Sequence, residues 1–384
     1  MANLIDYIKW RGDIPFSAMP FNEVDGLILS HFSYMPFDGI NFRPNYTRKA
    51  YTIEKISLLL QDYEESDFHL PNDKEFIQLL GKSVRFKDLR LTNHVRHHIN
   101  SEVIQFDAIT IHISDDEMYI SFCGTDATIV GWKDDFYISF MDETETQKTG
   151  QAYTKKVMTK YPDKKVHIGG HSKGGNTAVY SAVKLPPEMK ERVLDVRNYD
   201  GPGFPRRFRR NNDFDSIVDR LSTYVPQDSV FGQIFEHVGD KQVVISNATG
   251  ILQHDVYSWE VIGKDIVEID KNSVFSKINY DAISNWLETT SPETRKTVID
   301  IVFDVMMDTN KETVTEIKYE PQKLIIPILK GVYKLSLDDY KALGQILKAF
   351  IVCYIPAIRD NLMEESTNKL LDSLPPRIRI MLDI

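Results

Sequence analysis

This sequence has few cysteines and no excess of positive charge. Its 384 residues include two cysteines, Cys123 and Cys353, which are too few for a disulfide framework. This usage fits a reducing compartment and predicts a cytoplasmic protein. Lysine and arginine number 46 against 56 aspartate and glutamate residues, so the formal net charge is -10. We therefore do not expect general binding of nucleic acid, which requires a basic face that displaces counterions.

Long apolar runs are also missing. The best candidate for a membrane span, residues 349–358, has about half of the roughly 20 apolar residues required. Lys348 and Arg359 flank it, which favours a core helix; peripheral contact with a membrane surface is the alternative. The first 16 residues carry acidic side chains and no continuous apolar stretch, so we expect no secretory signal there.

Cofactor-binding patterns are absent as well. The sequence has no glycine-rich phosphate loop and no dinucleotide fingerprint. His94, His97 and His98 lie close together, but no carboxylate or cysteine pattern completes a metal site around them. We therefore expect neither a metal nor an organic cofactor. With 42% hydrophobic and 27% charged residues, the composition is that of an ordinary globular protein with a sizeable core.

The residue patterns divide the chain into three regions. Residues 1–85 mix helical periodicity with loops and are expected to form an N-terminal helical segment packed on the core. Residues 86–270 contain a predicted hairpin from about residue 107, followed by strands that alternate with helices, which predicts an α/β fold. Its sheet should be mainly parallel, with helices on both faces. Residues 271–384 have only helical patterns and are expected to form a C-terminal helical region.

One motif that carries chemistry lies where a predicted strand becomes a predicted helix. Gly170, Ser172 and Gly174 form a G-x-S-x-G pattern between these two elements. Small residues two positions before and two after the serine let the chain turn sharply. This context favours a nucleophile elbow over a plain tight turn. The amide of Lys173, at the helix start, would then donate to a developing oxyanion.

A serine nucleophile needs a histidine that removes its proton. In the chain order of α/β-hydrolases this base follows the serine, and only His237 and His254 come after Ser172. His237 lies at an apparent helix end, where a surface histidine is the usual interpretation. We choose His254, which lies in a loop after the strand near residue 245.

Two aspartates compete for the acid that orients the histidine. Asp200 ends one predicted strand, and Asp228 follows the next. The order of elements slightly favours Asp228, because the acid usually follows the penultimate strand. Asp255 is adjacent to His254 in sequence and is expected to face away. For either of the first two, a surface turn is the alternative interpretation.

Four segments together resemble a known family. "FCGTD", "GGHSKGG", "YVPQDSV" and "QHDVYSW" occur in the order and at the spacing of the class 3 lipase signatures. The chain more closely resembles the bacterial Mbeg1-like group of lipase-like proteins, also in "SFCGTDATIVGWKDDF" and "YDGPGF". The resemblance is firm over residues 108–259 and looser in the N-terminal "LILSHFSYMPFD". It implies the α/β-hydrolase fold.

The resemblance also implies roles for individual residues. It marks Ser172 as nucleophile, His254 as base and Asp228 as acid, and it aligns "YDGPGF" with a structural turn, which demotes Asp200. Thr125, at the end of the F-R-G-T-like segment, is expected to provide the second oxyanion contact through its amide and hydroxyl. The family's arginine in that segment is Cys123 here, a departure that would loosen this region if the arginine orders it.

Two further features, Trp132 and an arginine-rich segment, have two interpretations each. Trp132 and His171 are expected to line the substrate pocket, although Trp132 fits a packed helix start equally well. The segment "PRRFRRNNDF" has four arginines suited to a phosphate or an anionic head group, but a solvated face is the favoured interpretation.

The sequence thus predicts a serine hydrolase that cleaves a carboxylic ester, with a lipid-derived or small-molecule ester as substrate. A thioesterase, acyltransferase or amidase would use the same residues and is one alternative. A non-catalytic binding module on the same fold is another. An oligomeric state does not follow from any of these patterns.

Overall fold

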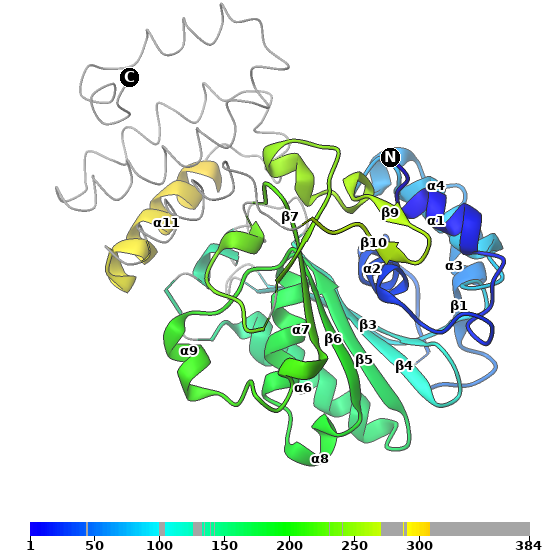
Figure 1. Ribbon diagram of the computed structural model, residues 1–384, viewed down its shortest axis with the longest axis horizontal. Coiled ribbons are helices and arrows are strands. Elements are labelled where there is room, and N and C mark those ends of the chain that lie inside the picture. The colour runs from blue at the N-terminus through cyan, green and yellow to red at the C-terminus, as the bar shows by residue number, and fades with distance from the viewer. Residues whose placement is uncertain are drawn as a thin grey trace, which may run out of the picture.

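The computed structural model describes residues 1–43, 45–99, 104–125, 133, 135–138, 140–141, 143–229, 231–239, 241–269, 287 and 290–307. These residues build one eight-stranded sheet in which the strands lie side by side in sequence order (Figure 1). The strands are β1 (Tyr51–Thr52), β2 (Arg90–Ile99), β3 (Ile104–His112), β4 (Glu117–Phe122), β5 (Lys165–His171), β6 (Val193–Tyr199), β7 (Leu221–Pro226) and β8 (Lys241–Val244). A separate two-stranded ribbon pairs β9 (Val261–Ile262) with β10 (Asp265–Ile266).

The sheet has an antiparallel and a parallel part. Strands β1 to β4 pair antiparallel, and β4 to β8 pair parallel. The predicted hairpin is confirmed as β3 and β4, which are in register from Ala108 opposite Phe122 to His112 opposite Met118. The predicted α/β fold with a mainly parallel sheet is likewise confirmed.

Helices cover both faces of the sheet (Figure 1). The N-terminal helices share one apolar cluster with the sheet, and the later helices share a second cluster on the other face. The first group is α1 (Leu4–Arg11), α2 (Glu23–Phe32), α3 (Ile53–Leu59) and α4 (Asp73–Lys82). The second group includes α6 (Glu145–Lys160), α7 (Lys173–Val183) and α9 (Arg206–Asn211), with α8 (Pro187–Lys190) close by in the chain.

The two faces follow from the alternation of side chains along each strand. On β4, Tyr119 belongs to the cluster under the N-terminal helices and Ile120 to the cluster under α6 and α7. The Tyr119 hydroxyl donates to the Gly26 carbonyl on α2 at 3.1 Å and lies 2.7 Å from Ser30 Oγ. Burial of Tyr119 is thus combined with hydrogen bonding of its one polar group.

The N-terminal helices are also fixed by caps and by one buried ion pair. Asn22 caps α2 in a capping box with Asp25. Arg85 and Asp25 form a salt bridge with both side chains fully buried. Arg85 Nη1 also donates to the Ile14 and Met19 carbonyls, so most of its donors are satisfied. The boundaries 1–85, 86–270 and 271–384 stay a prediction.

In the C-terminal region, α11 (Pro292–Met307) is described. Its Asp300 accepts hydrogen bonds from Tyr137 at 2.9 Å and pairs with Lys133 at 3.1 Å, so α11 contacts the segment after β4. Within the described residues, no helix has the length and hydropathy that a membrane crossing requires. The apolar run 349–358 lies outside the described residues.

Candidate catalytic site

Ser172 occupies the sharp corner between β5 and α7. Its φ of 58° and ψ of -133° lie in a region that residues other than glycine rarely adopt. The backbone amide of Ser172 donates to the Tyr199 carbonyl at the end of β6, 2.8 Å away. The serine is 5% exposed and directly precedes the first residue of α7, Lys173. This is the strand–turn–helix geometry that the G-x-S-x-G pattern predicts.

The two glycines of the motif are required by close packing of backbone. A Cβ on Gly174 would lie 2.1 Å from the Phe122 carbonyl oxygen, and one on Gly170 would lie 2.3 Å from the Gly174 carbonyl carbon. Gly124 packs equally closely, because a Cβ there would lie 2.8 Å from the Ser172 Cβ. The end of β4 and the start of α7 can approach Ser172 only because these residues have no side chain.

The expected oxyanion residues flank the serine from two elements. Lys173 begins α7, and Thr125 follows the end of β4 next to Gly124. The Thr125 hydroxyl donates to Asp135 Oδ2 at 2.5 Å, which fixes its side chain. Lys173 is buried, and its Nζ lies 3.1 Å from Gln105 Oε1 and 3.9 Å from Asp135 Oδ1. A buried lysine therefore connects this region to Asp135.

The His254 imidazole hydrogen-bonds to Asp200. Its Nδ1 lies 2.6 Å from Asp200 Oδ2, and the Asp200 side chain is fully buried. The other carboxylate oxygen of Asp200 accepts from Ser229 Oγ at 2.5 Å and from the Gly232 amide at 3.2 Å. Because its second oxygen is held by two donors, the carboxylate has a fixed direction toward the imidazole.

In the structure the hydrogen-bond partner of this imidazole is Asp200, whereas the sequence favoured Asp228 for that role. Asp228 instead accepts from Gln253 Nε2 at 2.8 Å, and its own amide donates to Gln253 Oε1 at 2.8 Å. Asp200 reaches His254 because it directly follows β6, beside β5 and the serine corner, in a left-handed conformation with φ of 53°. The residues "GPG" that follow Asp200 were a signal of an unusual turn there.

The structure separates the two candidate histidines. His237 Nε2 lies 2.8 Å from the Gly232 carbonyl, and burial lowers the pKa of His237 to about 4. His254 belongs to the short 3-10 helix Gly250–His254, and its ring centroid lies 4.3 Å from that of Phe231. Of the two, only His254 contacts both Asp200 and the residue before the serine, His171.

His171 connects three parts of the site. Its Nδ1 lies 3.0 Å from the Tyr34 hydroxyl, its Nε2 lies 2.9 Å from the His254 carbonyl, and its ring centroid lies 4.4 Å from that of His254. Burial and the nearby His254 hold the pKa of His171 well below its usual range, so the ring is neutral. Since a carbonyl only accepts, Nε2 carries the hydrogen and Nδ1 accepts from Tyr34.

Tyr34 is a residue that sequence reasoning did not assign to the site. Besides His171, its buried hydroxyl interacts with the backbone of Gly124 through a hydrogen bond. It lies just after α2 in the "LILSHFSYMPFD" segment, where the loose N-terminal resemblance was the available signal. Trp132, the other expected pocket residue, lies outside the described residues.

Ser172 Oγ and His254 Nε2, both within the described chain, are not joined by a hydrogen bond here. Catalytic hydrogen bonds of this kind are often long without substrate and tighten when it binds. Among the described residues there is no group of three or more His, Cys, Asp or Glu side chains that would hold a metal ion.

Comparison with known proteins places these residues in a wider context. A sequence model of the Mbeg1-like family matches residues 80–304, and no curated protein matches the chain. Among solved structures, the Rhizomucor miehei lipase–propeptide complex aligns over 66% of this chain and 75% of its own, with 14% identity and a TM-score of 0.38. Lip2 lipase from Yarrowia lipolytica aligns over 66% and 87%, with 12% identity and a TM-score of 0.34. Lipase II from Rhizopus niveus aligns over 64% and 88%, with 13% identity and a TM-score of 0.34. Likenesses this distant do not establish a shared reaction.

Proposed function

Because this chain belongs to the Mbeg1-like family, whose model spans more than half of it, we propose that it is a serine hydrolase that cleaves carboxylic esters. One observation carries the proposal. His254 is paired at 2.6 Å with the fully buried Asp200, beside the strained corner that holds Ser172. A buried carboxylate that fixes one imidazole nitrogen leaves the other available as a base, which is the arrangement that activates a serine.

In the proposed reaction, Ser172 Oγ attacks the carbonyl carbon of the ester while His254 Nε2 takes the hydroxyl proton. Asp200 holds Nδ1–H and stabilises the imidazolium. The tetrahedral intermediate collapses, the C–O bond to the alcohol breaks, and the imidazolium returns its proton to the departing oxygen. Water then attacks the acyl-enzyme in the same way and releases the acid and free Ser172.

The oxyanion of each tetrahedral intermediate would accept from the backbone amides of Lys173 and Thr125. The Lys173 amide lies in the first turn of α7, where amides have no partner within the helix and the dipole favours negative charge. The bond from Thr125 to Asp135 supports this assignment, because it fixes the strand end from which the second amide must point.

His171 and Tyr34 are positioning residues in this proposal. They link the Gly124 backbone, the serine corner and the His254 carbonyl through hydrogen bonds of neutral groups. Such a network holds the oxyanion strand, the nucleophile and the base in one arrangement. We place the protein in the cytoplasm on its cysteine usage alone.

A fluorophosphonate probe tests whether Ser172 is a nucleophile. The wild-type chain should be labelled and Ser172→Ala should not. Ser181→Ala is the matched control, because Ser181 lies on α7 but is fully buried, and that variant should label like wild type. Equal labelling of wild type and Ser172→Ala would exclude Ser172.

The substrate class is tested separately with p-nitrophenyl esters of increasing acyl length, together with matched thioesters and anilides. We expect ester hydrolysis that is lost in Ser172→Ala, with the preferred length reporting pocket depth. Probe labelling combined with turnover of only thioesters or anilides would retain the nucleophile and refute the ester assignment. Neither labelling nor turnover would favour a binding module.

A further inference from the structure

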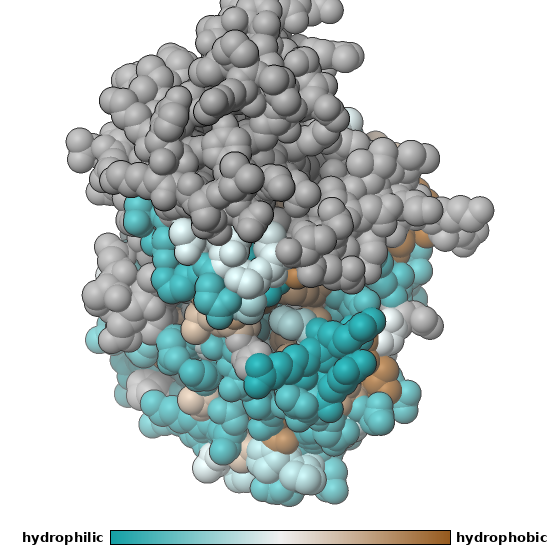
Figure 2. Space-filling view, turned by 90° about the vertical axis from the view of Figure 1, so that its left-hand side faces the viewer, coloured by the Kyte–Doolittle hydropathy of each residue, from teal (hydrophilic) through white to brown (hydrophobic). Residues whose placement is uncertain are grey.

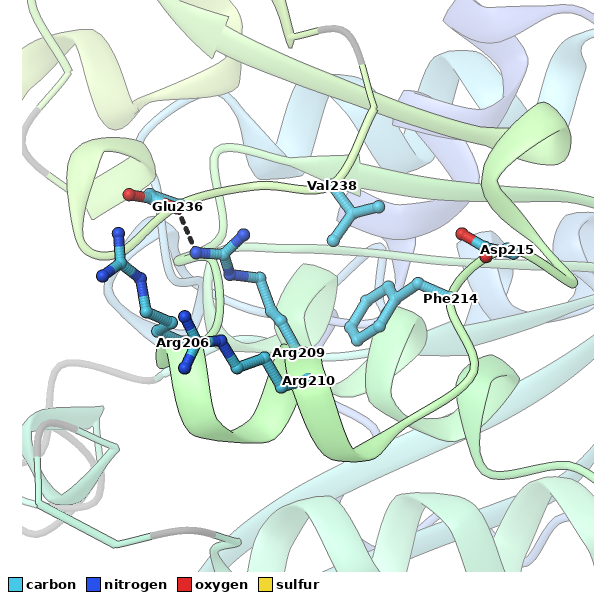
Figure 3. A pocket seen from close by; sticks show the side chains of 7 residues that line it. All are labelled: Arg206, Arg209, Arg210, Phe214, Asp215, Glu236 and Val238. Carbon is cyan, nitrogen blue, oxygen red and sulfur yellow. Dashed lines mark hydrogen bonds and ion pairs between the residues drawn. The ribbon is translucent and has the colours of Figure 1, made fainter.

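A pocket lined by arginines lies on α9, apart from the residues of the proposed reaction. Arg206, Arg209 and Arg210 line it from one side, and its volume is about 440 Å³ (Figure 3). Glu236 and Asp215 are the acidic residues of its lining. In Figure 3 the three guanidinium groups gather at one end of the pocket, near Glu236, and Asp215 lies at the far end beyond Phe214.

The three arginines are only partly neutralised by their surroundings. Arg209 pairs with Glu236, yet its Nε is buried and has no hydrogen-bond partner within the described chain. Arg206 and Arg210 make no ion pair or hydrogen bond with any residue that the structure describes. Both are exposed, so their donors remain available to a ligand.

Their spacing works against the helix unless an anion binds. Arg206 and Arg210 are four residues apart, and Arg206 and Arg209 three apart, so all three project from one side of α9. Like charges at this spacing destabilise a helix. The protein as a whole has a net charge of -10, so this local excess of cations is not part of a general basic surface.

Backbone hydrogen bonds join the segments that line the pocket to the chain that follows Asp200. The Gly203 amide donates to the Ile234 carbonyl at 2.8 Å, and the Phe204 amide donates to the Glu236 carbonyl at 3.1 Å. These bonds join the chain after Asp200 to the segment that carries Glu236. The pocket is therefore supported by a paired backbone, which preorganises the side chains that line it.

The surface around α9 favours a charged ligand over an apolar one. Figure 2 views the molecule from the side on which α9 lies, and the coloured part of this face is largely hydrophilic, with small, scattered apolar areas. A continuous apolar patch, the usual sign of a docking surface for an apolar partner, is not seen among the residues coloured there.

We propose that Arg206, Arg209 and Arg210 form a binding site for a phosphate group. Guanidinium groups match phosphate oxygens with paired N–H donors, and the three oxygens of a terminal phosphate can accept from three arginines at once. A carboxylate has only two oxygens and one negative charge, so it satisfies this cluster less well. The site goes beyond ester hydrolysis, and its test does not depend on that activity.

The phosphate belongs either to a soluble molecule or to a lipid head group, and two binding measurements on the full chain distinguish these sources. In the first, inorganic phosphate and pyrophosphate are titrated by calorimetry at low salt, with acetate for comparison. In the second, sedimentation measures binding to phosphatidylcholine vesicles with and without phosphatidic acid. Saturable binding in the first, or phosphatidic-acid-dependent binding in the second, is the expected result.

Single variants show whether the pocket is responsible. Arg206→Gln and Arg210→Gln should each weaken binding about tenfold, the effect of losing one charge-assisted interaction. Arg207→Gln removes the same charge from the same helix outside the pocket, and it should change affinity by less than about twofold. Thermal unfolding of all three variants checks that the fold is retained.

The proposal is overturned if neither phosphate nor phosphatidic acid binds saturably to the wild-type chain. It is also overturned if Arg207→Gln weakens binding as much as the pocket variants do, because the effect would then be that of general charge. Acetate binding as tight as phosphate binding would refute the assignment to phosphate. These outcomes leave the labelling of Ser172 unaffected, so the two proposals can fail separately.

Discussion

Asp200 illustrates how one residue's backbone conformation decides which side chains meet. Its positive φ turns the carboxylate of a residue at the end of β6 into the protein, where Ser229, Gly232 and His254 surround it. Asp228, which the sequence favoured, lies two residues beyond β7 and bonds to Gln253. Residue types and order narrowed the acid to these two positions. The choice between them depended on the φ angle of Asp200, which the order of elements along the chain does not predict.

The Asp200 and Asp228 pair gives a direct test of this assignment. Asp200→Asn removes the carboxylate that fixes the imidazole and should lower kcat by about 10³ to 10⁴. Asp228→Asn keeps most of the contact with Gln253 and should change kcat by less than about tenfold. Steady-state kinetics on the best ester substrate compares the two. A larger loss in Asp228→Asn would return the role of acid to Asp228.

Tyr34 allows a second test at the residue scale. Tyr34→Phe removes the hydroxyl that bonds His171 and the Gly124 backbone, so we expect kcat to fall about tenfold while KM changes little. The matched control is Tyr46→Phe, which removes an exposed hydrogen bond to Asp115 and should leave kcat unchanged. A rise in KM with an unchanged kcat would indicate substrate contact rather than positioning.

At the scale of elements, the sequence predicted the helices and strands around the site better than it predicted which aspartate contacts His254. Alternating apolar and polar residues predicted the β3–β4 hairpin and the strand β5. Helix-forming residues and the placement of glycines predicted α7 and the corner that joins it to β5. The pairing of β1 to β4 as an antiparallel group, and the order of these strands in the sheet, could not be predicted from the sequence. Strand pairing there joins segments far apart in the chain, and periodicity within one segment carries no information about its partner.

The junction between β4 and α7 is sensitive to the addition of a single methyl group. In Gly174→Ala, the new Cβ would lie 2.1 Å from the Phe122 carbonyl oxygen, which belongs to backbone and cannot move away cheaply. We expect the free energy of unfolding in urea to fall by about 3 kcal/mol. Gly39→Ala is the control: it has open space but a φ of 77°, and should cost about 1 kcal/mol. Equal losses would show that steric contact at Gly174 is not limiting.

At the scale of the whole molecule, the sequence predicted the layers but not the burial of individual histidines. His112 and His171 are buried and His237 is half-buried, each beside other cations or polar backbone. From the sequence, His237 was expected at the surface because it lies at an apparent helix end, whereas the structure half-buries it, with its Nε2 2.8 Å from the Gly232 carbonyl. Burial of this kind is set by tertiary packing. Because burial disfavours protonation of these histidines, it should make the stability of the whole protein depend on pH.

Burial, followed by the nearby Lys164, lowers the pKa of His112 to about 3, burial lowers that of His237 to about 4, and the pKa of His171 is also depressed. Below the unfolded pKa of about 6.5, the unfolded chain binds protons at these sites and the native chain does not. Stability should therefore fall as the pH falls, by up to about 1.4 kcal/mol per histidine at pH 5.5. His167 acts in the opposite sense: burial alone would lower its pKa, but its bond to Asp195 raises it.

With three histidines against one, the free energy of unfolding in urea should be about 2 to 4 kcal/mol lower at pH 5.5 than at pH 7.5. His112→Asn removes one of the three titrating groups, so the difference between the two pH values should shrink by about 1.4 kcal/mol even if the variant is less stable at both. Each protein is compared with itself at the two pH values, so the variant need not be as stable as the wild type. A pH difference in His112→Asn as large as that in wild type would show that this histidine is not a source of the acid sensitivity.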